Sequence, residues 1–383
     1  MRSLLFAALG SLAALFGGCA LVADYGFSSY EERPGGGTST GTGGAGGADA
    51  TTSSTTTTAT AGGGENAGGS GGAGGSGGSG GAGGAGGGPI QVLYQGENRP
   101  NSLALDATAV YWTTSNQYMQ PDGTVNRIDK SGQNYHSIAT QVPSPSSIKV
   151  SSTRVYWFTV QNSVSMIDSA PKSGGSVAHL YDPQELIVGF DANDQNVYWA
   201  GSSSGIWTIG VNGSNPHVLI PDQSMAADIL VDVAGQKIYW LNIGTVAQNN
   251  GAVMRADLGG GNVTAIATNQ SFPLAIAMDS SKIYWSTLKG GVFSVNKDGS
   301  GIATHVTPTA SDPPASGVAV DDMYIYYTKG AALRRVPLGS TISSLVYDAA
   351  GSDSSPKLVE VDAQAVYFTA TSASSGRVIR LEK

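Results

Sequence analysis

Residues 282–287 read Lys282-Ile283-Tyr284-Trp285-Ser286-Thr287, and the centre of this segment, an aliphatic residue followed by Tyr and a second large aromatic residue, recurs along the chain. The other copies are Val110-Tyr111-Trp112, Val155-Tyr156-Trp157, Val197-Tyr198-Trp199, Ile238-Tyr239-Trp240, Ile325-Tyr326-Tyr327 and Val366-Tyr367-Phe368. Successive copies lie 41 to 45 residues apart. A nearly constant period of this size is typical of β-propeller blades. The sequence therefore predicts an all-β fold, a seven-bladed propeller.

The repeat around Trp285 indicates how one blade is built. Residues 274–279 are expected to form an apolar innermost strand, 282–287 the strand with the aromatic pair, and 291–296 a third strand. Residues 297–301, Lys-Asp-Gly-Ser-Gly, make a turn of the kind that needs positive φ angles, and 303–307 then form the outer strand. We expect each blade to contain four antiparallel strands.

Two large aromatic side chains stand side by side in every repeat. Neighbouring residues of a strand point to opposite faces, and adjacent blades cover both faces of a propeller sheet. Each pair should therefore fill two inter-blade interfaces, with the preceding Val or Ile on the face of the second aromatic residue. Burial of about 1.5 to 3 kcal/mol per side chain, before entropy is subtracted, makes a metal or disulfide unnecessary for the fold.

The two ends of the repeat region are expected to close the ring. The last copy stops at Lys383 after its third strand, residues 377–381, while residues 91–95 form an extra strand ahead of the first copy. Pairing this N-terminal strand with the last blade supplies the missing outer strand and protects both edges.

The repeats resemble the YWTD propeller repeats of lipoprotein-receptor ectodomains. The corresponding tetrads in this chain are YWTT, YWFT, YWAG, YWLN, YWST, YYTK and YFTA, within residues 91–383. The chain departs from that family in having seven copies instead of six, no literal YWTD and no cysteine-rich modules. The resemblance implies the fold and does not carry over the receptor function.

Composition divides the chain of 383 residues before the repeats begin. Its 55 glycines are concentrated in residues 34–89, a Gly/Ser/Thr/Ala-rich segment with almost nothing apolar to bury, which we expect to be a disordered linker. Residues 90–383 are expected to be the propeller. The net charge is -8 and there is no Lys/Arg cluster, so nucleic acid is not an expected partner.

The N-terminus reads as an export signal over residues 1–19, with Arg2 before an apolar run that is too short for a membrane span. Leu15-Phe16-Gly17-Gly18-Cys19 resembles the lipobox of bacterial lipoproteins, although Phe16 stands where that family usually has Leu. The resemblance implies a lipid anchor on Cys19, and Ala20 implies release to the outer membrane. The alternative is an ordinary secretory signal with an incidental cysteine, for a periplasmic or secreted protein. Residues 20–33 are a short tether.

Aspartates end the innermost strand in six of the seven repeats, namely Asp106, Asp191, Asp232, Asp279, Asp321 and Asp362. A ring of carboxylates is compatible with a cation site. However, an aspartate just before a tight turn in nearly every blade is what an Asx-type turn cap predicts, and we favour this structural role. We expect no metal site and no cofactor.

The histidines fall near the expected outer strands of different blades, so they should not converge as metal ligands or as one general base. They are His136, His179, His217 and His305. In each innermost strand, the residue two positions before the aspartate, or before Ser151, is mostly small. Lys149 and Glu360 are the charged exceptions. These two are either polar groups of an axial channel or, as we favour, a solvated pair of strand charges.

The loops between second and third strands, and between blades, should share one face and vary most in length. Functional residues tend to lie on variable loops over a rigid scaffold. The candidate ligand-binding residues on that face are Tyr118, Gln120, Asp122, Asn249, Asn250, Phe272, Lys289 and Lys329.

These observations favour a lipid-anchored lipoprotein of the bacterial outer membrane or cell surface. Its propeller is expected to act as a monomeric, non-enzymatic binding module for a protein or glycan. The alternative is a hydrolase or lyase of the propeller lactonase type that uses a divalent cation and carboxylates near the axis.

Overall fold

The computed structural model describes residues 88–96, 99–115, 121–161, 164–223, 226–245, 248–349, 355–371 and 375–383. The expected signal with Cys19, the tether and residues 34–87 of the expected linker lie outside the described residues. So do Tyr118 and Gln120.

The described chain forms strands that group into blades in sequence order. The first blade contains β2 (Arg99–Leu105), β3 (Ala109–Ser115), β4 (Gly123–Asp129) and β5 (His136–Val142). The second contains β6 (Pro145–Val150), β7 (Arg154–Gln161), β8 (Val164–Pro171) and β9 (Ala178–Tyr181). The third contains β10 (Ile187–Ala192), β11 (Asn196–Gly201), β12 (Gly205–Gly210) and β13 (His217–Pro221). The fourth contains β14 (Ala226–Asp232), β15 (Lys237–Asn242), β16 (Gly251–Asp257) and β17 (Thr264–Gln270). The fifth contains β18 (Pro273–Met278), β19 (Lys282–Thr287), β20 (Val292–Asn296) and β21 (Ala303–Val306). The sixth contains β22 (Ala315–Val320), β23 (Tyr324–Lys329), β24 (Ala332–Pro337) and β25 (Ser344–Asp348). The seventh contains β26 (Ser355–Val361), β27 (Ala365–Thr371), β28 (Gly376–Glu382) and β1 (Ile90–Gly96).

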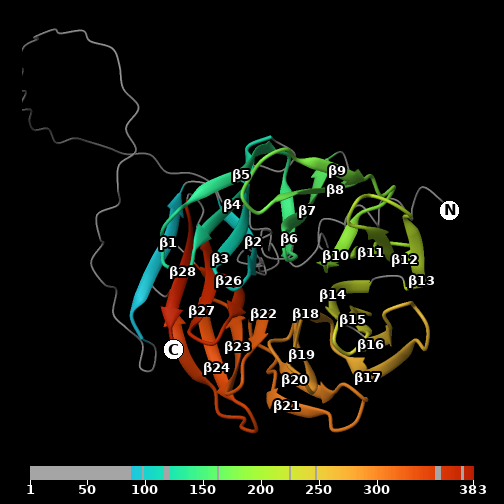
Figure 1. Ribbon diagram of the computed structural model, residues 1–383. Coiled ribbons are helices and arrows are strands. Elements are labelled where there is room, and N and C mark those ends of the chain that lie inside the picture. The colour runs from blue at the N-terminus through green and yellow to red at the C-terminus, as the bar shows by residue number, and fades with distance from the viewer. Residues whose placement is uncertain are drawn as a thin grey trace, which may run out of the picture. The chain divides into compact units, whose positions relative to one another are not determined.

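The seven sheets are four-stranded and antiparallel, and consecutive strands are neighbours in six of them. Figure 1 shows the sheets arranged around one axis, with the first strand of each blade innermost. This confirms the predicted seven-bladed propeller. We call the side with the turns between first and second strands the turn face, and the opposite side the loop face. The described residues contain no helix of the length and apolarity needed to cross a membrane.

The ring closes as predicted, because β1 supplies the outer strand of the seventh blade. Ile90 pairs with Leu381 and Gly96 with Gly376 in an antiparallel register. The Gln91 side chain of the same strand donates to the Ser131 carbonyl of the first blade over 3.2 Å. The N-terminal strand therefore joins the last blade and also reaches the first.

The paired aromatic residues fill two inter-blade layers, as the alternation of strand side chains predicts. Tyr111 belongs to a buried cluster that includes Trp157 of the second blade. Trp112, the next residue, belongs to a cluster with Val110 and with Tyr367 of the seventh blade. Every side chain in these positions is almost fully buried. The core is thus a set of layers between blades.

The pairing of every innermost strand with its neighbour contains a register shift near the start of the innermost strand. The shifts lie between Pro100/Ser102, Ser146/Ile148, Ile187/Gly189, Ala227/Ile229, Pro273/Ile276, Ala315/Gly317 and Pro356/Val359. A bulge re-aims the side chains beside it. Residues inside these irregularities, such as Ser147, Asp228 and Ser316, line the space around the axis.

Candidate functional site

The turn face is built around aspartates that accept hydrogen bonds from their own turns. Oδ1 of Asp106 accepts the backbone N–H groups of Thr108 and Ala109, both at 2.8 Å. Its Oδ2 accepts the Tyr111 hydroxyl at 2.8 Å. The equivalent aspartates that accept at least one turn N–H are Asp232, Asp279, Asp321 and Asp362. These five carboxylates occupy the geometry of an Asx-type cap.

Asp191 departs from this expectation. The turn of the third blade is capped by Asn193, whose Oδ1 accepts the N–H groups of Gln195 and Asn196, both at 2.8 Å. Oδ2 of Asp191 instead accepts the N–H of Val231 in the next blade at 2.8 Å. The prediction that Asp191 caps a turn is wrong, because a second Asx residue holds the capping position.

Four lysines join neighbouring blades on the turn face, an arrangement that the sequence analysis missed. Each lysine directly follows the third strand of one blade and binds the turn aspartate of the preceding blade; we call each pair a Lys–Asp clasp. The four clasps, by Nζ–Oδ2 distance, are Lys130–Asp362 (2.7 Å), Lys172–Asp106 (2.8 Å), Lys297–Asp232 (2.7 Å) and Lys383–Asp321 (2.5 Å). Three of these ammonium groups also lie over a tyrosine ring of that preceding blade.

Three blades carry an apolar residue at the lysine position. These residues are Val211, Leu258 and Leu338, and their backbone N–H groups make the same turn hydrogen bond as those of the lysines. By the repeat, Val211 and Leu258 correspond to turns capped by Ser151 and Asn193, which carry no charge. At two of these three blade junctions, the lysine of one blade and the turn aspartate of the preceding blade are therefore both replaced by uncharged residues.

The clasps fix the charge state of the turn face. Burial raises the pKa of Asp106, but the Lys172 ammonium, the Thr108 amide and the Tyr111 hydroxyl outweigh burial and hold that pKa well below its usual range. Burial and the hydrogen bond to Asp106 raise the pKa of Tyr111 to about 12. At neutral pH the carboxylate is ionised and the phenol is neutral.

The histidines lie on or at the start of outer strands of four blades, as the repeat predicts. They are His136 in β5, His179 in β9, His217 in β13 and His305 in β21. His179 contacts Asp168 at 2.9 Å, and this contact raises the pKa of the imidazole. His305 is buried against the Ser294 hydroxyl at 2.9 Å, and burial lowers its pKa.

On the loop face the structure brings only some of the candidate residues together. Nζ of Lys289 in the fifth blade donates to Oδ1 of Asn249 in the fourth over 3.4 Å. Lys329 in the sixth blade lies beside Gly290 and forms an ion pair with Asp312 at 2.8 Å. The loops of three consecutive blades therefore contribute polar groups to one region.

The other described candidates have different surroundings. Asn250 accepts the Thr245 N–H at 2.7 Å and so closes its own loop. Asp122 is half-buried immediately before β4. Phe272 is not available to a ligand: it is 6% exposed and belongs to a buried cluster with Leu274. Its φ of 53° places the residue in a left-handed turn, which corrects the expectation that Phe272 lies on the surface.

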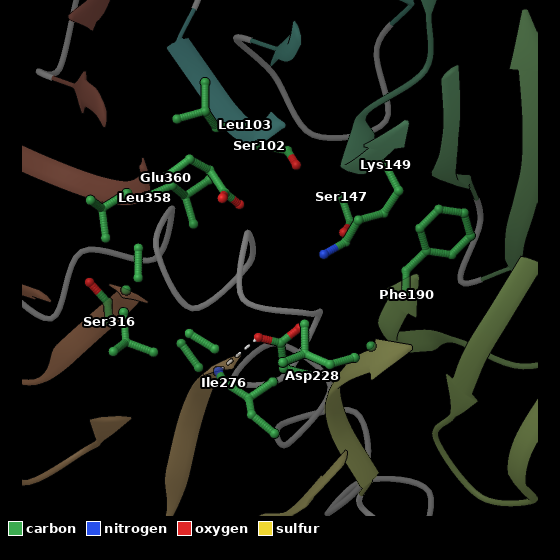
Figure 2. A pocket seen from close by; sticks show the side chains of 18 of the residues that line it. Ser102, Leu103, Ser147, Lys149, Phe190, Asp228, Ile276, Ser316, Leu358 and Glu360 are labelled. Carbon is green, nitrogen blue, oxygen red and sulfur yellow. Dashed lines mark hydrogen bonds between the residues drawn. The ribbon is translucent and has the colours of Figure 1, made fainter. Parts of the chain in front are cut away.

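The axis of the ring contains a polar cavity of about 320 Å³. Lys149 of β6, Asp228 of β14 and Glu360 of β26 line it, and Figure 2 shows their side chains extending from three sides. Apolar walls complete it, among them Leu103 and Phe190. Lys149 and Glu360 are thus groups of the axial cavity, which is the alternative that the sequence analysis had not favoured.

Burial governs the titration of the acids around this cavity. It raises the pKa of Glu360 to about 7, with Asp228 and Asp191 adding to the increase while Lys149 opposes it. Burial also raises the pKa of Asp191, again opposed by Lys149. Asp228 accepts the N–H of Ile276 in the next blade over 3.1 Å. Within the described ranges, no group of three or more His, Cys, Asp or Glu side chains is arranged to hold a metal ion.

No family model matches the sequence, and no curated protein matches it. Solved structures match in fold. The WD40 β-propeller domain of Doa1 aligns with a TM-score of 0.58 and 12% identity, covering 76% of this chain and 96% of that one. YCF48 from Cyanidioschyzon merolae aligns with a TM-score of 0.56 and 12% identity, covering 76% of this chain and 98% of that one. A chain of a nidogen/laminin complex aligns with a TM-score of 0.47 and 15% identity, over 62% of this chain and 91% of that one. At these identities the first two likenesses show the β-propeller fold alone.

Proposed function

We propose that the chain is a lipid-anchored, non-enzymatic binding module of the bacterial outer membrane or cell surface, whose loop face binds a protein or a glycan. The observation that carries this proposal is the difference between the two faces of the ring. On the turn face, the charged side chains of the clasps bind one another across blades. On the loop face, the exposed Asn249 and the half-buried Lys289, Lys329 and Asp312 gather polar groups from neighbouring blades in one region.

The binding region that we propose consists of Asn249, Lys289, Lys329 and Asp312, and we call it the loop-face patch. It combines an amide, two ammonium groups and a carboxylate on loops of the fourth, fifth and sixth blades. Ammonium and amide groups bind carboxylates and hydroxyls, which both proteins and glycans present. A rigid propeller holds such groups in place before binding, so little conformational entropy is lost on association.

The anchor completes the proposal. The lipobox-like segment ending at Cys19 and the Gly-rich segment behind it would tether the propeller to a membrane while leaving its orientation free. Replacement of Cys19 by Ser should abolish incorporation of a labelled fatty acid and release the chain from the detergent phase on partitioning. A C19S chain that still incorporates the label would remove the anchor from the proposal.

The binding site is tested with the full chain on arrays of glycans and of isolated envelope proteins. N249A combined with K289A should weaken any saturable binding about 10-fold or more, because both polar partners are removed from the patch. K237A is the matched control, since Lys237 pairs with Asp257 within one blade away from the loop face. Equal loss of binding in both variants, or no loss in the patch variant, would contradict the proposed site.

A further inference from the structure

The acids of the axial cavity outnumber its basic group. Asp228 and Glu360 line the cavity, Asp191 acts on Glu360 electrostatically, and Lys149 is the one basic residue among the described lining residues. One ammonium therefore stands against three carboxyl groups. Such an excess of negative charge in a space enclosed by protein favours a cation.

The Glu360 carboxyl group in the cavity lacks a hydrogen-bond donor from the described residues. Its side chain is aimed into the cavity, and it has no hydrogen bond or ion pair with any described residue (Figure 2). Burial is the main cause of its raised pKa, although the residue is half-buried and not fully enclosed. A half-buried carboxylate to which no described residue donates a hydrogen bond is open to a ligand that supplies a donor.

The rest of the lining indicates what kind of cation would fit. The described residues do not place three acidic or imidazole ligands around one point, as a metal ion needs. Hydroxyl groups of Ser147 and Ser316 stand beside apolar side chains such as Leu358 and Ile276. The volume of about 320 Å³ is at the lower end for small-molecule sites.

We propose that the axial cavity is a binding site for a small organic cation, a primary amine on a short uncharged tail, whose ammonium group is held by Glu360 and Asp228. The ammonium supplies the donors that the Glu360 carboxylate lacks, and the tail packs on the apolar wall. Lys149 repels a second positive charge, so the site selects a monocation over a diamine. This site does not depend on the loop-face patch or on its partner.

The affinity should depend on pH through Glu360. The titratable groups that face it are Lys149 on β6, Asp191 on β10 and Asp228 on β14, while the described lining residues of β2, β18 and β22 do not titrate. Below pH 7 the Glu360 carboxyl is protonated and no longer attracts an ammonium. Affinity should therefore fall about 5-fold between pH 7 and pH 6, and level off above pH 8.

The test is calorimetric titration of the full chain with propylamine, and with 1-propanol as an uncharged molecule of nearly the same shape. Propylamine is expected to bind saturably at pH 8 and 1-propanol is not. E360Q should weaken propylamine binding about 10-fold or more and abolish its pH dependence. D228N provides a second variant, and E382Q makes the same chemical change outside the cavity and should bind as the wild type does.

Several outcomes would overturn the proposal. These are propylamine binding that E360Q and D228N leave unchanged, equal binding of 1-propanol, or the absence of saturable propylamine binding in the wild type. Calcium ions that displace propylamine and bind more tightly would replace the amine site with a metal site. Intact fluorescence of the buried tryptophans shows whether each variant is folded.

Discussion

Nζ of Lys172 in the second blade lies 2.8 Å from Oδ2 of Asp106 in the first blade and 5.7 Å from the centre of the Tyr111 ring. One ammonium therefore binds two side chains of its neighbour, and Asp106 in turn holds the turn that precedes Tyr111. The contact joins two blades whose strands share no hydrogen-bonded ladder. It is repeated three more times around the ring.

Replacement of Lys172 by Met should cost about 1–2 kcal/mol of unfolding free energy, because the half-buried Asp106 loses its charged partner. Urea unfolding at pH 7 measures this, and K237M, which breaks a more exposed pair within one blade, should cost less. The clasp depresses the pKa of Asp106, so its contribution is complete above pH 4 and is lost as the pH falls through the lowered pKa. A K172M chain as stable as the wild type at pH 7 would show that the clasp is not stabilising.

A clasp should be transferable to the sixth blade. By the repeat, Leu338 corresponds to the lysine position that faces Asp279, whose carboxylate already accepts the Tyr284 hydroxyl at 2.7 Å. L338K should therefore lower the Asp279 pKa further and raise the unfolding free energy by about 0.5 kcal/mol, net of the lost apolar contact. V211K, which faces the uncharged Ser151, is the control and should bring no gain. A larger gain from V211K than from L338K would refute the assignment of partners.

Glu360 makes stability depend on pH in the opposite sense to Asp106. Its folded pKa of about 7 lies above its ordinary value of 4.5, so the folded state binds the proton more tightly. Its stabilising effect is complete below about pH 4.5 and is lost as the pH rises to about 7. E360Q should consequently be more stable than the wild type by about 1–3 kcal/mol at pH 8 and differ little at pH 4. Thermal unfolding across this range measures the difference, and a pH-independent effect of E360Q would contradict it.

Asp191 and Asn193 should differ in what their loss costs. D191A leaves the N–H of Val231 between two blades without its acceptor, which costs about 1–3 kcal/mol. N193A removes a cap from an exposed turn, which costs about 1 kcal/mol or less. Hydrogen exchange should show faster exchange at Val231 only in D191A. If the Val231 amide hydrogen exchanges at the same rate in both variants, Asp191 does not accept the Val231 N–H.

The sequence predicted the fold because the information lies in short segments. The period of the aromatic pairs gives the number of blades, and the alternation of strand side chains assigns Tyr111 and Trp112 to different interfaces. The missing outer strand of the last repeat predicted that β1 closes the ring. These features depend on counting along the chain, and no contact between distant residues had to be known.

The contacts between charged side chains were harder to predict from the sequence. Lys130 and Asp362 are separated by 232 positions, so their contact depends on how the ring closes. A sequence signal existed, since lysine recurs directly after the third strand. In five of the other six blades the capping residue lies six positions before the second aromatic residue, and this spacing would have selected Asn193 over Asp191 in the third blade. No local pattern brings Lys149 and Glu360 together at the axial cavity, or turns Phe272 into the core.

The central claim, that the loop face binds a partner and the turn face holds the ring together, is tested most directly by hydrogen exchange. The full lipidated chain would be compared alone and bound to outer-membrane vesicles from cells that lack the chain. The account predicts new protection at residues 248–250, 289–290 and 329–330 and none at the turn-face residues 130–134 and 297–301. Protection confined to the turn-face residues, or no protection in the propeller while the chain is bound, would contradict it.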